Sequence, residues 1–214
     1  MQKSAHITGI TGQDGTYLAE FLIEKGYNVH GLVRNLSTIS RETLPSAFSD
    51  VDLIEGDLRN EESLRKAVSQ SIPDEIYNLA AHTNVATSWD ESTNVIDINS
   101  LGFARLLNVI RESKREPRIF QASSCQVFGL ADESPQNENT EFRPQNPYGA
   151  SKAITLYLTK SNYTHNKQNK KKKQQQKHTQ KNKNTNTNTQ KQKQKQQTKK
   201  KTTQKPKTHT TPKN

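Results

Sequence analysis

Hydrophobic and polar positions along residues 1–160 alternate between two periods. Short apolar runs typical of buried strands occupy residues 5–9, 28–33, 52–55, 75–79 and 118–122. Between these runs, apolar residues recur at spacings of three and four, as in amphipathic helices; one such face carries Phe103, Leu106 and Ile110. Strands that alternate with helices predict right-handed β–α–β crossovers and a parallel sheet. We therefore expect a doubly wound α/β domain over residues 1–163.

The pattern ends at residue 164. From there to Asn214 only Lys, Gln, Asn, Thr, His and Pro occur, and no apolar residue is available to bury. Such a segment cannot offset the entropy cost of ordering, so we expect residues 164–214 to form a disordered tail. The six amino acids are also the full set encoded by codons that contain only A and C. This favours translated low-complexity nucleotide sequence over a selected tail.

Charge divides the chain at the same place. The formal net charge is +11 and only 29% of residues are hydrophobic, which suggests a basic disordered protein. Residues 166–214 hold 17 Lys and no acid, however, so the preceding residues carry a net charge of −6. We expect nucleic acid to bind only non-specifically, through the tail and by counterion release. A protein whose tail binds polyanions remains one alternative.

Cysteine usage and the apolar runs bear on the compartment. The single cysteine, Cys125, excludes an internal disulfide and fits a reducing environment. No run approaches the roughly 20 apolar residues of a membrane helix, and the first residues do not resemble a signal peptide. We expect a cytoplasmic protein with no membrane partner. No His/Cys cluster has metal-ligand spacing, so no metal is expected.

A glycine-rich turn follows the first predicted strand and precedes the first predicted helix. Three glycines at this spacing permit a tight turn, close approach of backbone to a pyrophosphate, and close helix–strand packing. The helix N-terminus supplies free N–H groups for the phosphates. The turn predicts a Rossmann-like dinucleotide site, with a merely tight β–α turn as the alternative. Its expected cofactor-binding residues are Gly9, Thr11, Gly12, Gln13, Asp14 and Gly15.

The end of the second strand bears on the choice of cofactor. An acidic residue there would bind the ribose 2′-hydroxyl of NAD, but the chain has Arg34, which would attract a 2′-phosphate. We therefore expect NADP. Ser37 and Arg41 are further donors, unless they are solvated loop residues, an alternative favoured for Arg41.

Two later strand ends complete the predicted cofactor site. Asp57 and Leu58 follow the third strand and are expected to flank the adenine. The fourth strand closes with Leu79, Ala80 and Ala81, whose position leaves room for a cofactor. Ordinary core packing is the alternative for the two alanines.

Candidate catalytic residues follow the fifth strand. Ser124 comes just after that strand, and Tyr148 and Lys152, four residues apart, share one face of a predicted helix. A lysine beside a tyrosine lowers the pKa of a phenol, so a phenolate can exchange protons with a substrate hydroxyl. A serine at the neighbouring strand end can hydrogen-bond the same oxygen.

These motifs together resemble the extended short-chain dehydrogenase/reductase family of nucleotide-sugar enzymes, and within it the GDP-mannose 4,6-dehydratases. The resemblance covers residues 4 to about 163. It is carried by residues 7–22, 78–81, 135–140 and 146–152, which include Gly-Ile-Thr-Gly-Gln-Asp-Gly and Asn-Pro-Tyr-Gly-Ala-Ser-Lys.

The resemblance implies a reaction and a role for each candidate. In the family, NADP takes a hydride from C4 of the sugar, water leaves across C5–C6, and the hydride returns to C6. Tyr148 would be the base at the C4 hydroxyl, with Lys152 tuning it and Ser124 supporting the same oxygen. Gln126 stands where these dehydratases usually carry the glutamate that removes the C5 proton. Because an amide cannot act as that base, we expect elimination to fail.

The resemblance also defines alternatives. A related nucleotide-sugar epimerase or reductase would suit Gln126 better. His82, where glutamine is common, is an acid–base candidate, although a structural histidine is favoured. The family's remaining strands and its nucleotide-sugar domain are expected after Tyr163, where the tail begins instead. The resemblance thus implies that the chain is the cofactor-binding half of an enzyme that acts on GDP-mannose. It leaves open whether the chain forms homo-oligomers. We do not expect the chain alone to turn over substrate.

Overall fold

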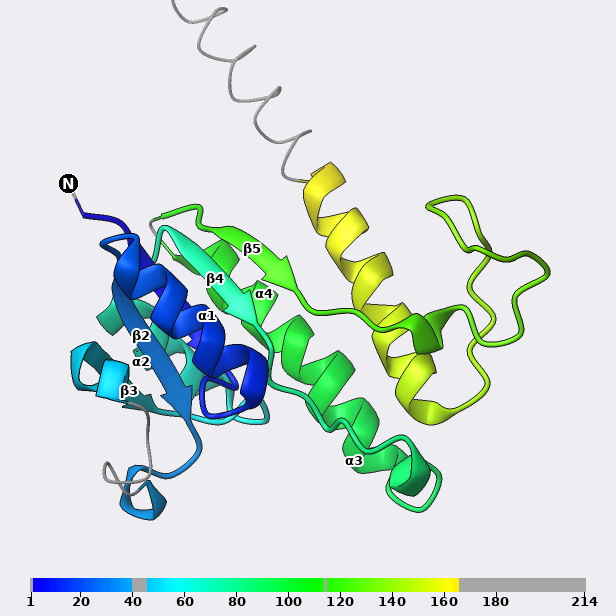
Figure 1. Cartoon of the computed structure of the whole chain (residues 1–214), viewed down its shortest axis with the longest axis horizontal. Coiled ribbons are helices and arrows are strands. Elements are labelled where there is room, and N and C mark those ends of the chain that lie inside the picture. The colour runs from blue at the N-terminus through cyan, green and yellow to red at the C-terminus, as the bar shows by residue number, and fades with distance from the viewer. Residues whose placement is uncertain (1, 40–45, 114, 166–214) are drawn as a thin grey trace, which may run out of the picture. The chain divides into compact units, whose positions relative to one another are not determined.

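The computed structural model describes residues 2–39, 46–113 and 115–165. Five parallel strands form one sheet in the order β3-β2-β1-β4-β5 (Figure 1). They are β1 (Ser4–Thr8), β2 (Asn28–Val33), β3 (Val51–Glu55), β4 (Glu75–Asn78) and β5 (Arg118–Gln121). The chain moves outward from β1 to β3 and then returns to β4 on the other side of β1. This order places a topological switch point between β1 and β4, and it confirms the doubly wound α/β fold.

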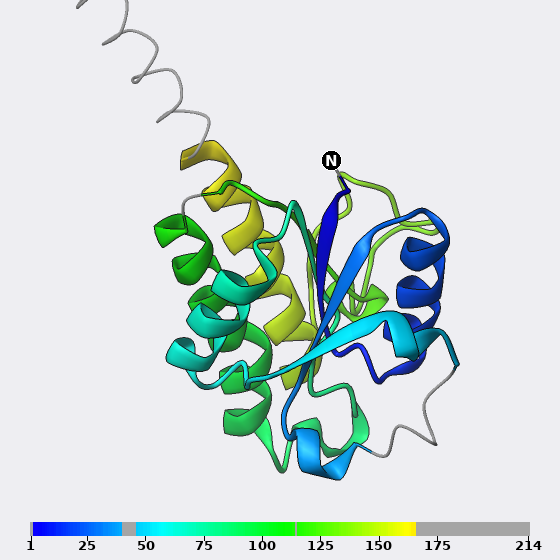
Figure 2. The same cartoon turned by 90° about the vertical axis from the view of Figure 1, so that its left-hand side faces the viewer.

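Helices cover both faces of the sheet (Figure 2). One face carries α1 (Gln13–Glu24), and the other carries α2 (Glu61–Ser71) and α4 (Gly102–Glu112). The short α3 (Ser92–Ile96) leads into α4 through a π-helical segment, Asp97–Leu101. A further helix spans residues 147–165 and so includes the first two residues of the predicted tail.

Two apolar clusters hold these layers together. Ala5 and Ile7 of β1 pack with Leu22 of α1, whereas Ile76 of β4 packs with Leu106 of α4. The central strand β1 is buried along most of its length, whereas the edge strands β3 and β5 carry exposed polar residues such as Asp52 and Arg118. Burial on both faces, and the apolar pattern that goes with it, is therefore strongest in the middle of the sheet. None of the helices among the described residues is long and apolar enough to cross a membrane.

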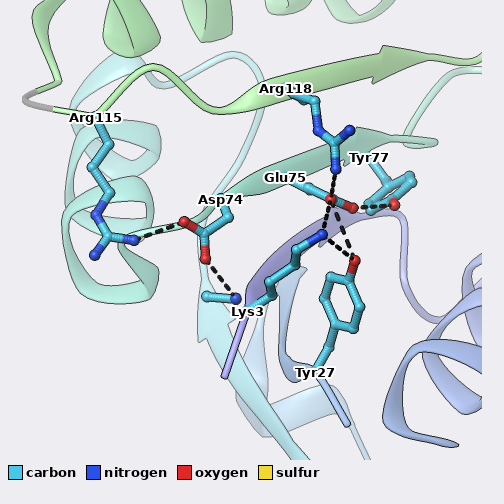
Figure 3. A network of polar contacts seen from close by, with 8 residues as sticks. Lys3, Tyr27, Asp74, Glu75, Tyr77, Arg115 and Arg118 are labelled. Atoms are coloured by element: carbon cyan, nitrogen blue, oxygen red, sulfur yellow. Dashed lines mark hydrogen bonds and ion pairs between the residues drawn. The ribbon is translucent and has the colours of Figure 1, made fainter. Parts of the chain in front are cut away.

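The amino-terminal end of the sheet carries a polar network centred on Glu75 (Figure 3). The hydroxyls of Tyr77 and Tyr27 donate to its carboxylate at 2.7 and 3.3 Å, and Arg118 forms an ion pair with it. Lys3 Nζ lies 3.6 Å from the same carboxylate, whose side chain is only 8% exposed. The Tyr77 hydrogen bond and the neighbouring cations hold the pKa of Glu75 below its usual value. The network joins the starts of β1, β4 and β5, so we assign it to stability.

Two predictions fall on residues outside the described part of the chain. Arg41 is one, and residues 166–214, most of the predicted tail, are the other. Disorder of the tail therefore stays a prediction.

Candidate functional site

A cavity of about 500 Å³ opens at the carboxyl ends of β1, β2, β3 and β4, next to the switch point. Its lining includes seven of the predicted cofactor residues: Gly9, Thr11, Arg34, Asp57, Leu58, Ala80 and Ala81. Ligands of doubly wound sheets bind at this position because strand ends diverge at the switch point and leave a crevice. The structure thus brings together residues that lie as far as 72 positions apart in the sequence.

The glycine turn forms the inner wall of the cavity. Gly9 has a φ of +72°, and a Cβ there would lie 2.7 Å from the Ala80 nitrogen. A Cβ on Gly15 would lie 2.3 Å from the Gly9 carbonyl oxygen. Both positions therefore exclude any larger residue, one through backbone conformation and contact, the other through contact alone. The turn lets β1 pass directly into α1 while staying in contact with β4.

Helix α1 presents an uncapped N-terminus. Its N-cap residue, Gly12, has no side chain to accept a hydrogen bond, and the first α-helical bond runs from the Thr16 nitrogen to the Gly12 oxygen at 2.9 Å. The N–H groups of the first turn accordingly have no helical acceptor. Gln13 and Asp14 are exposed there. These N–H groups, the close approach at Gly9 and the cavity beside them fit the diphosphate of a dinucleotide.

Charged groups line the outer part of the cavity. Arg34 follows β2 and is exposed. Beyond it, Asp57 forms a two-pronged ion pair with Arg59, with Nη2–Oδ2 and Nε–Oδ1 distances of 2.7 and 3.1 Å. The Arg59 hydrogen bond holds the pKa of Asp57 below its usual value, and the charge of Arg34 adds to the effect. The cavity thus contains two guanidinium groups and one carboxylate that is already paired.

Two of the catalytic candidates, Tyr148 and Lys152, lie beyond β5 on the 147–165 helix. Tyr148 and Lys152 are 8% and 3% exposed. Lys152 Nζ donates to the Ala122 carbonyl oxygen at 3.0 Å and lies 5.8 Å from the centroid of the Tyr148 ring. Burial lowers the pKa of Lys152 to about 8. At neutral pH the side chain is therefore still mostly protonated, and its charge stands beside the phenol.

The segment after β5 packs against the start of this helix. The Gln126 nitrogen donates to Ser124 Oγ at 3.2 Å. The amide of Asn146, just before the helix, donates to Gln126 Oε1 at 3.0 Å. The four catalytic candidates, Ser124, Gln126, Tyr148 and Lys152, accordingly gather around one helix start. The Gln126 amide is held in place but has no group that can remove a proton from carbon.

A chain of buried and partly buried hydrogen bonds links the cavity to Lys152. The Ala80 nitrogen donates to Thr8 Oγ1 at 3.1 Å, and Thr8 Oγ1 donates to Asn78 Oδ1 at 2.5 Å. Asn78 Nδ2 in turn donates to Gln121 Oε1 at 2.7 Å. The Gln121 amide bonds the Ala122 carbonyl oxygen at 3.0 Å, and Lys152 bonds the same oxygen. Three neighbouring strands therefore set the position of the lysine relative to the glycine turn.

Some predicted cofactor residues lie elsewhere than on the cavity wall. In the described part of the chain, the following predicted cofactor residues are not among its lining residues: Gly12, Gln13, Asp14, Gly15, Leu79, Tyr148 and Lys152. Leu79 packs its side chain against the core cluster that covers α1.

His82 lies on the cavity wall in a fixed orientation. Its Nε2 is 2.8 Å from a Glu91 oxygen, and its Nδ1 is buried with no partner among the described residues. The His82 backbone nitrogen donates to Asn99 Oδ1 at 2.7 Å, and Asn99 Nδ2 donates to Ser151 Oγ at 2.9 Å. Because Glu91 engages Nε2 and Nδ1 is buried, the ring is held in place, which favours the structural interpretation of His82.

Sequence reasoning missed Arg59 and Asn99. Arg59 could have been found from its place, two residues after Asp57 at the end of a predicted strand. Asn99 carries no sequence signal, since it lies within an apparently regular helix and its contacts become visible only in the fold. Over the described residues, no group of three His, Cys, Asp or Glu side chains could hold a metal ion.

Comparison of the sequence with known families finds one whose model is described as GDP-mannose 4,6 dehydratase, matched over residues 7–170. The GDP-mannose 4,6-dehydratase of Yersinia enterocolitica is 40% identical over 166 residues, which cover 73% of this chain and 45% of the relative. GDP-mannose 4,6 dehydratase 1 of Arabidopsis thaliana is 41% identical over 170 residues, covering 74% and 47%. The chain thus spans about half the length of the curated relatives it matches.

Solved structures with the same fold include nucleotide-sugar epimerases. UDP-glucose 4-epimerase of Thermus thermophilus, solved as a complex with NAD, matches with a TM-score of 0.63 and 28% identity over 75% of this chain and 51% of that one. The Brucella ovis UDP-glucose 4-epimerase, also in complex with NAD, matches with a TM-score of 0.65 and 26% identity over 73% and 46%. In both cases about half of the larger enzyme corresponds to this chain.

Proposed function

The chain belongs to the GDP-mannose 4,6-dehydratase family, and from that membership we propose that its residues 1–163 bind NADP and supply the proton-transfer residues for dehydration of GDP-mannose to GDP-4-keto-6-deoxymannose. The observation that carries the proposal is the cavity at the switch point. Gly9, where a Cβ cannot fit, lines this cavity together with Thr11 and Arg34, and the turn that contains Gly9 leads into the uncapped N-terminus of α1.

The cofactor residues divide along the dinucleotide. The N–H groups that follow Gly12 would bind the pyrophosphate, because they lack helical acceptors. Arg34 would pair with the 2′-phosphate, and no acidic residue adjoins it in the sequence to repel that phosphate. The bound nicotinamide supplies hydride transfer to and from the sugar. The epimerase structures solved in complex with NAD support a nicotinamide cofactor for this chain, and Arg34 supports NADP over NAD.

Proton transfer would be the task of the residues on the 147–165 helix. The Tyr148 phenolate would accept the proton of the sugar C4 hydroxyl as C4 is oxidised, becoming the neutral phenol, and would lose that proton again when C4 is reduced. The Lys152 ammonium would stabilise the phenolate before the transfer, since it is mostly protonated at neutral pH and buried beside the ring. Ser124 would donate a hydrogen bond to the same sugar oxygen. Tyr148 and Lys152 would also contact the nicotinamide end of the cofactor.

Gln126 favours a second candidate function. Dehydration needs a base at C5, and the Gln126 amide, bonded to Asn146, cannot serve. A nucleotide-sugar epimerase or reductase oxidises or reduces a sugar carbon, and neither reaction needs the base at C5 that elimination requires. The resemblance of the fold to UDP-glucose 4-epimerases is consistent with this alternative.

Cofactor choice gives the first test. We expect the chain to bind NADP more tightly than NAD, and Arg34→Asp to reverse the preference, because a carboxylate repels the 2′-phosphate and can bind a ribose hydroxyl. Titration by calorimetry with both dinucleotides measures this. Arg111→Asp, an exposed site on α4 outside the cavity lining, is the matched control. Equal or tighter binding of NAD by the unchanged chain would contradict the NADP assignment.

The reaction itself gives the second test. Incubated with GDP-mannose and NADP, the 214-residue chain should form no measurable 4-keto-6-deoxy product, since lack of the base alone costs on the order of 10²–10⁴ in rate. A chimera with the C-terminal half of the Yersinia enterocolitica relative should oxidise C4, and Gln126→Glu in that chimera should restore elimination. Brisk dehydration by a chimera that still carries Gln126 would show that another group is the base. A chimera that binds NADP but never oxidises C4 would refute the roles of Tyr148 and Lys152.

A further inference from the structure

Arg59 occupies the outermost position along the candidate cofactor site. Successive strand ends, read outward from the centre of the sheet, carry the glycine turn after β1, Arg34 after β2 and Arg59 after β3. All three line the same cavity. A dinucleotide whose pyrophosphate lies at the turn and whose ribose phosphate lies at Arg34 would place its purine base one strand further out. That position is the end of β3.

The Arg59 guanidinium is locked in place by Asp57. Two side-chain hydrogen bonds, at 2.7 and 3.1 Å, join its edge to the two carboxylate oxygens. The backbone nitrogen of Arg59 donates a third bond to Asp57 Oδ1 at 2.8 Å. Bonds of this kind lie in the plane of the guanidinium, so its two flat faces remain available. The side chain is 47% exposed, which leaves it accessible from the cavity.

We propose that Arg59 is the platform on which the purine base of the cofactor stacks, held flat by Asp57. The proposal rests on the proposed function, because it assumes a purine dinucleotide in this cavity. It also gives Asp57 a definite task. With its carboxylate already paired, Asp57 is a positioning residue for Arg59 and contributes less as a direct acceptor for the base. A planar, delocalised cation stacks on an aromatic ring in a way that an ammonium group cannot.

Stacking and phosphate pairing make different predictions for the two dinucleotides. NAD and NADP share the adenine and differ only in the 2′-phosphate. If Arg59 stacks on the base, its replacement should weaken both ligands by the same factor. If Arg59 instead pairs with the 2′-phosphate, only NADP should be affected, as expected for Arg34.

The experiment measures dissociation constants of NAD and NADP for the whole chain and for three variants by calorimetric titration. Arg59→Lys keeps the charge and removes the plane, whereas Arg59→Met removes both. Arg65→Lys is the matched control, an arginine on α2 that is also paired with glutamates but does not line the cavity. We expect both Arg59 variants to weaken NAD and NADP about 5-fold, equivalent to about 1 kcal/mol, and Arg65→Lys to leave both unchanged.

Each other outcome has a definite meaning. Unchanged affinity in Arg59→Lys would overturn stacking, as would a loss confined to NADP. Thermal denaturation of each variant, without ligand, separates a local effect from unfolding, and a variant less stable than Arg65→Lys is replaced by Arg59→Gln. If the unchanged chain binds neither dinucleotide, the proposed cofactor site fails and stacking fails with it. If the unchanged chain binds both dinucleotides and the Arg59 variants bind them equally well, the cofactor site stands and stacking alone is wrong.

Discussion

The buried histidine of β1 should make the stability of this protein unusually sensitive to mild acid. His6 is fully buried, and neither ring nitrogen has a hydrogen-bond partner in the described part of the chain. Burial, reinforced by the charge of His30, lowers the pKa of His6 from 6.5 to about 4. Each pKa unit corresponds to about 1.4 kcal/mol, so the full effect is roughly 3 kcal/mol. That is a large part of the 5–15 kcal/mol typical of a folded domain.

The sign follows from which state binds the proton first. Above about pH 6.5 the histidine is neutral in both the folded and the unfolded chain, and stability does not depend on it. As the pH falls from 6.5 toward 4, the unfolded chain becomes protonated while the folded chain does not, so the free energy of unfolding decreases. Below about pH 4 both states are protonated and the loss no longer grows.

Urea denaturation at pH 7.5, 6, 5 and 4 would test this for the unchanged chain and for His6→Leu. We expect the leucine variant to be at least as stable at pH 7.5, because it removes two unpaired buried nitrogens, and to gain roughly 3 kcal/mol relative to the unchanged chain by pH 4. Ile7→Leu, at the neighbouring buried position, should shift stability equally at every pH. Parallel pH profiles for the unchanged chain and His6→Leu would refute the reasoning.

Two further predictions concern the glycine turn and the Glu75 network. Gly9→Ala should lose NADP binding in calorimetric titration and should lower the free energy of unfolding by more than Gly26→Ala does. Gly26 is the control because it has a similar φ of +77° but nothing within 4 Å of an added Cβ. Its replacement therefore measures the backbone cost alone, about 1–2 kcal/mol. Equal losses would show that contact with Ala80 does not matter. Glu75→Gln should cost about 1–2 kcal/mol in urea denaturation at pH 7, because two tyrosine hydroxyls and Arg118 lose a charged acceptor, and should leave NADP affinity unchanged.

The elements themselves were predictable to within a residue or so. The strands expected at residues 28–33 and 118–122 are found at Asn28–Val33 and Arg118–Gln121, since each contains branched or aromatic apolar residues that favour strands. The long helix around Leu106 was expected, but its π-helical interruption was not. That interruption includes Asn99, whose amide bonds both the His82 backbone and Ser151. No local pattern reports such partners.

The candidate site divides in the same way. The glycine turn could be recognised because each glycine answers a local steric demand, and Arg34 because the end of the second strand has a fixed place in this topology. The bond from Lys152 to the Ala122 carbonyl, 30 residues away, was not visible in the sequence. The sequence also did not show that the Leu79 side chain packs against the core, and a role of Leu79 at the cofactor site stays a prediction.

By itself, the sequence determined the order of strands and helices, the glycine turn and the types of residue at the strand ends. These features depend on periodicity and sterics over a few neighbouring residues. Only the tertiary structure decided which distant side chains meet, such as Thr8 with Asn78 and Asn99 with Ser151. Contacts between segments 70 residues apart depend on how whole strands align and how helices cover them, and no short stretch of sequence carries that information.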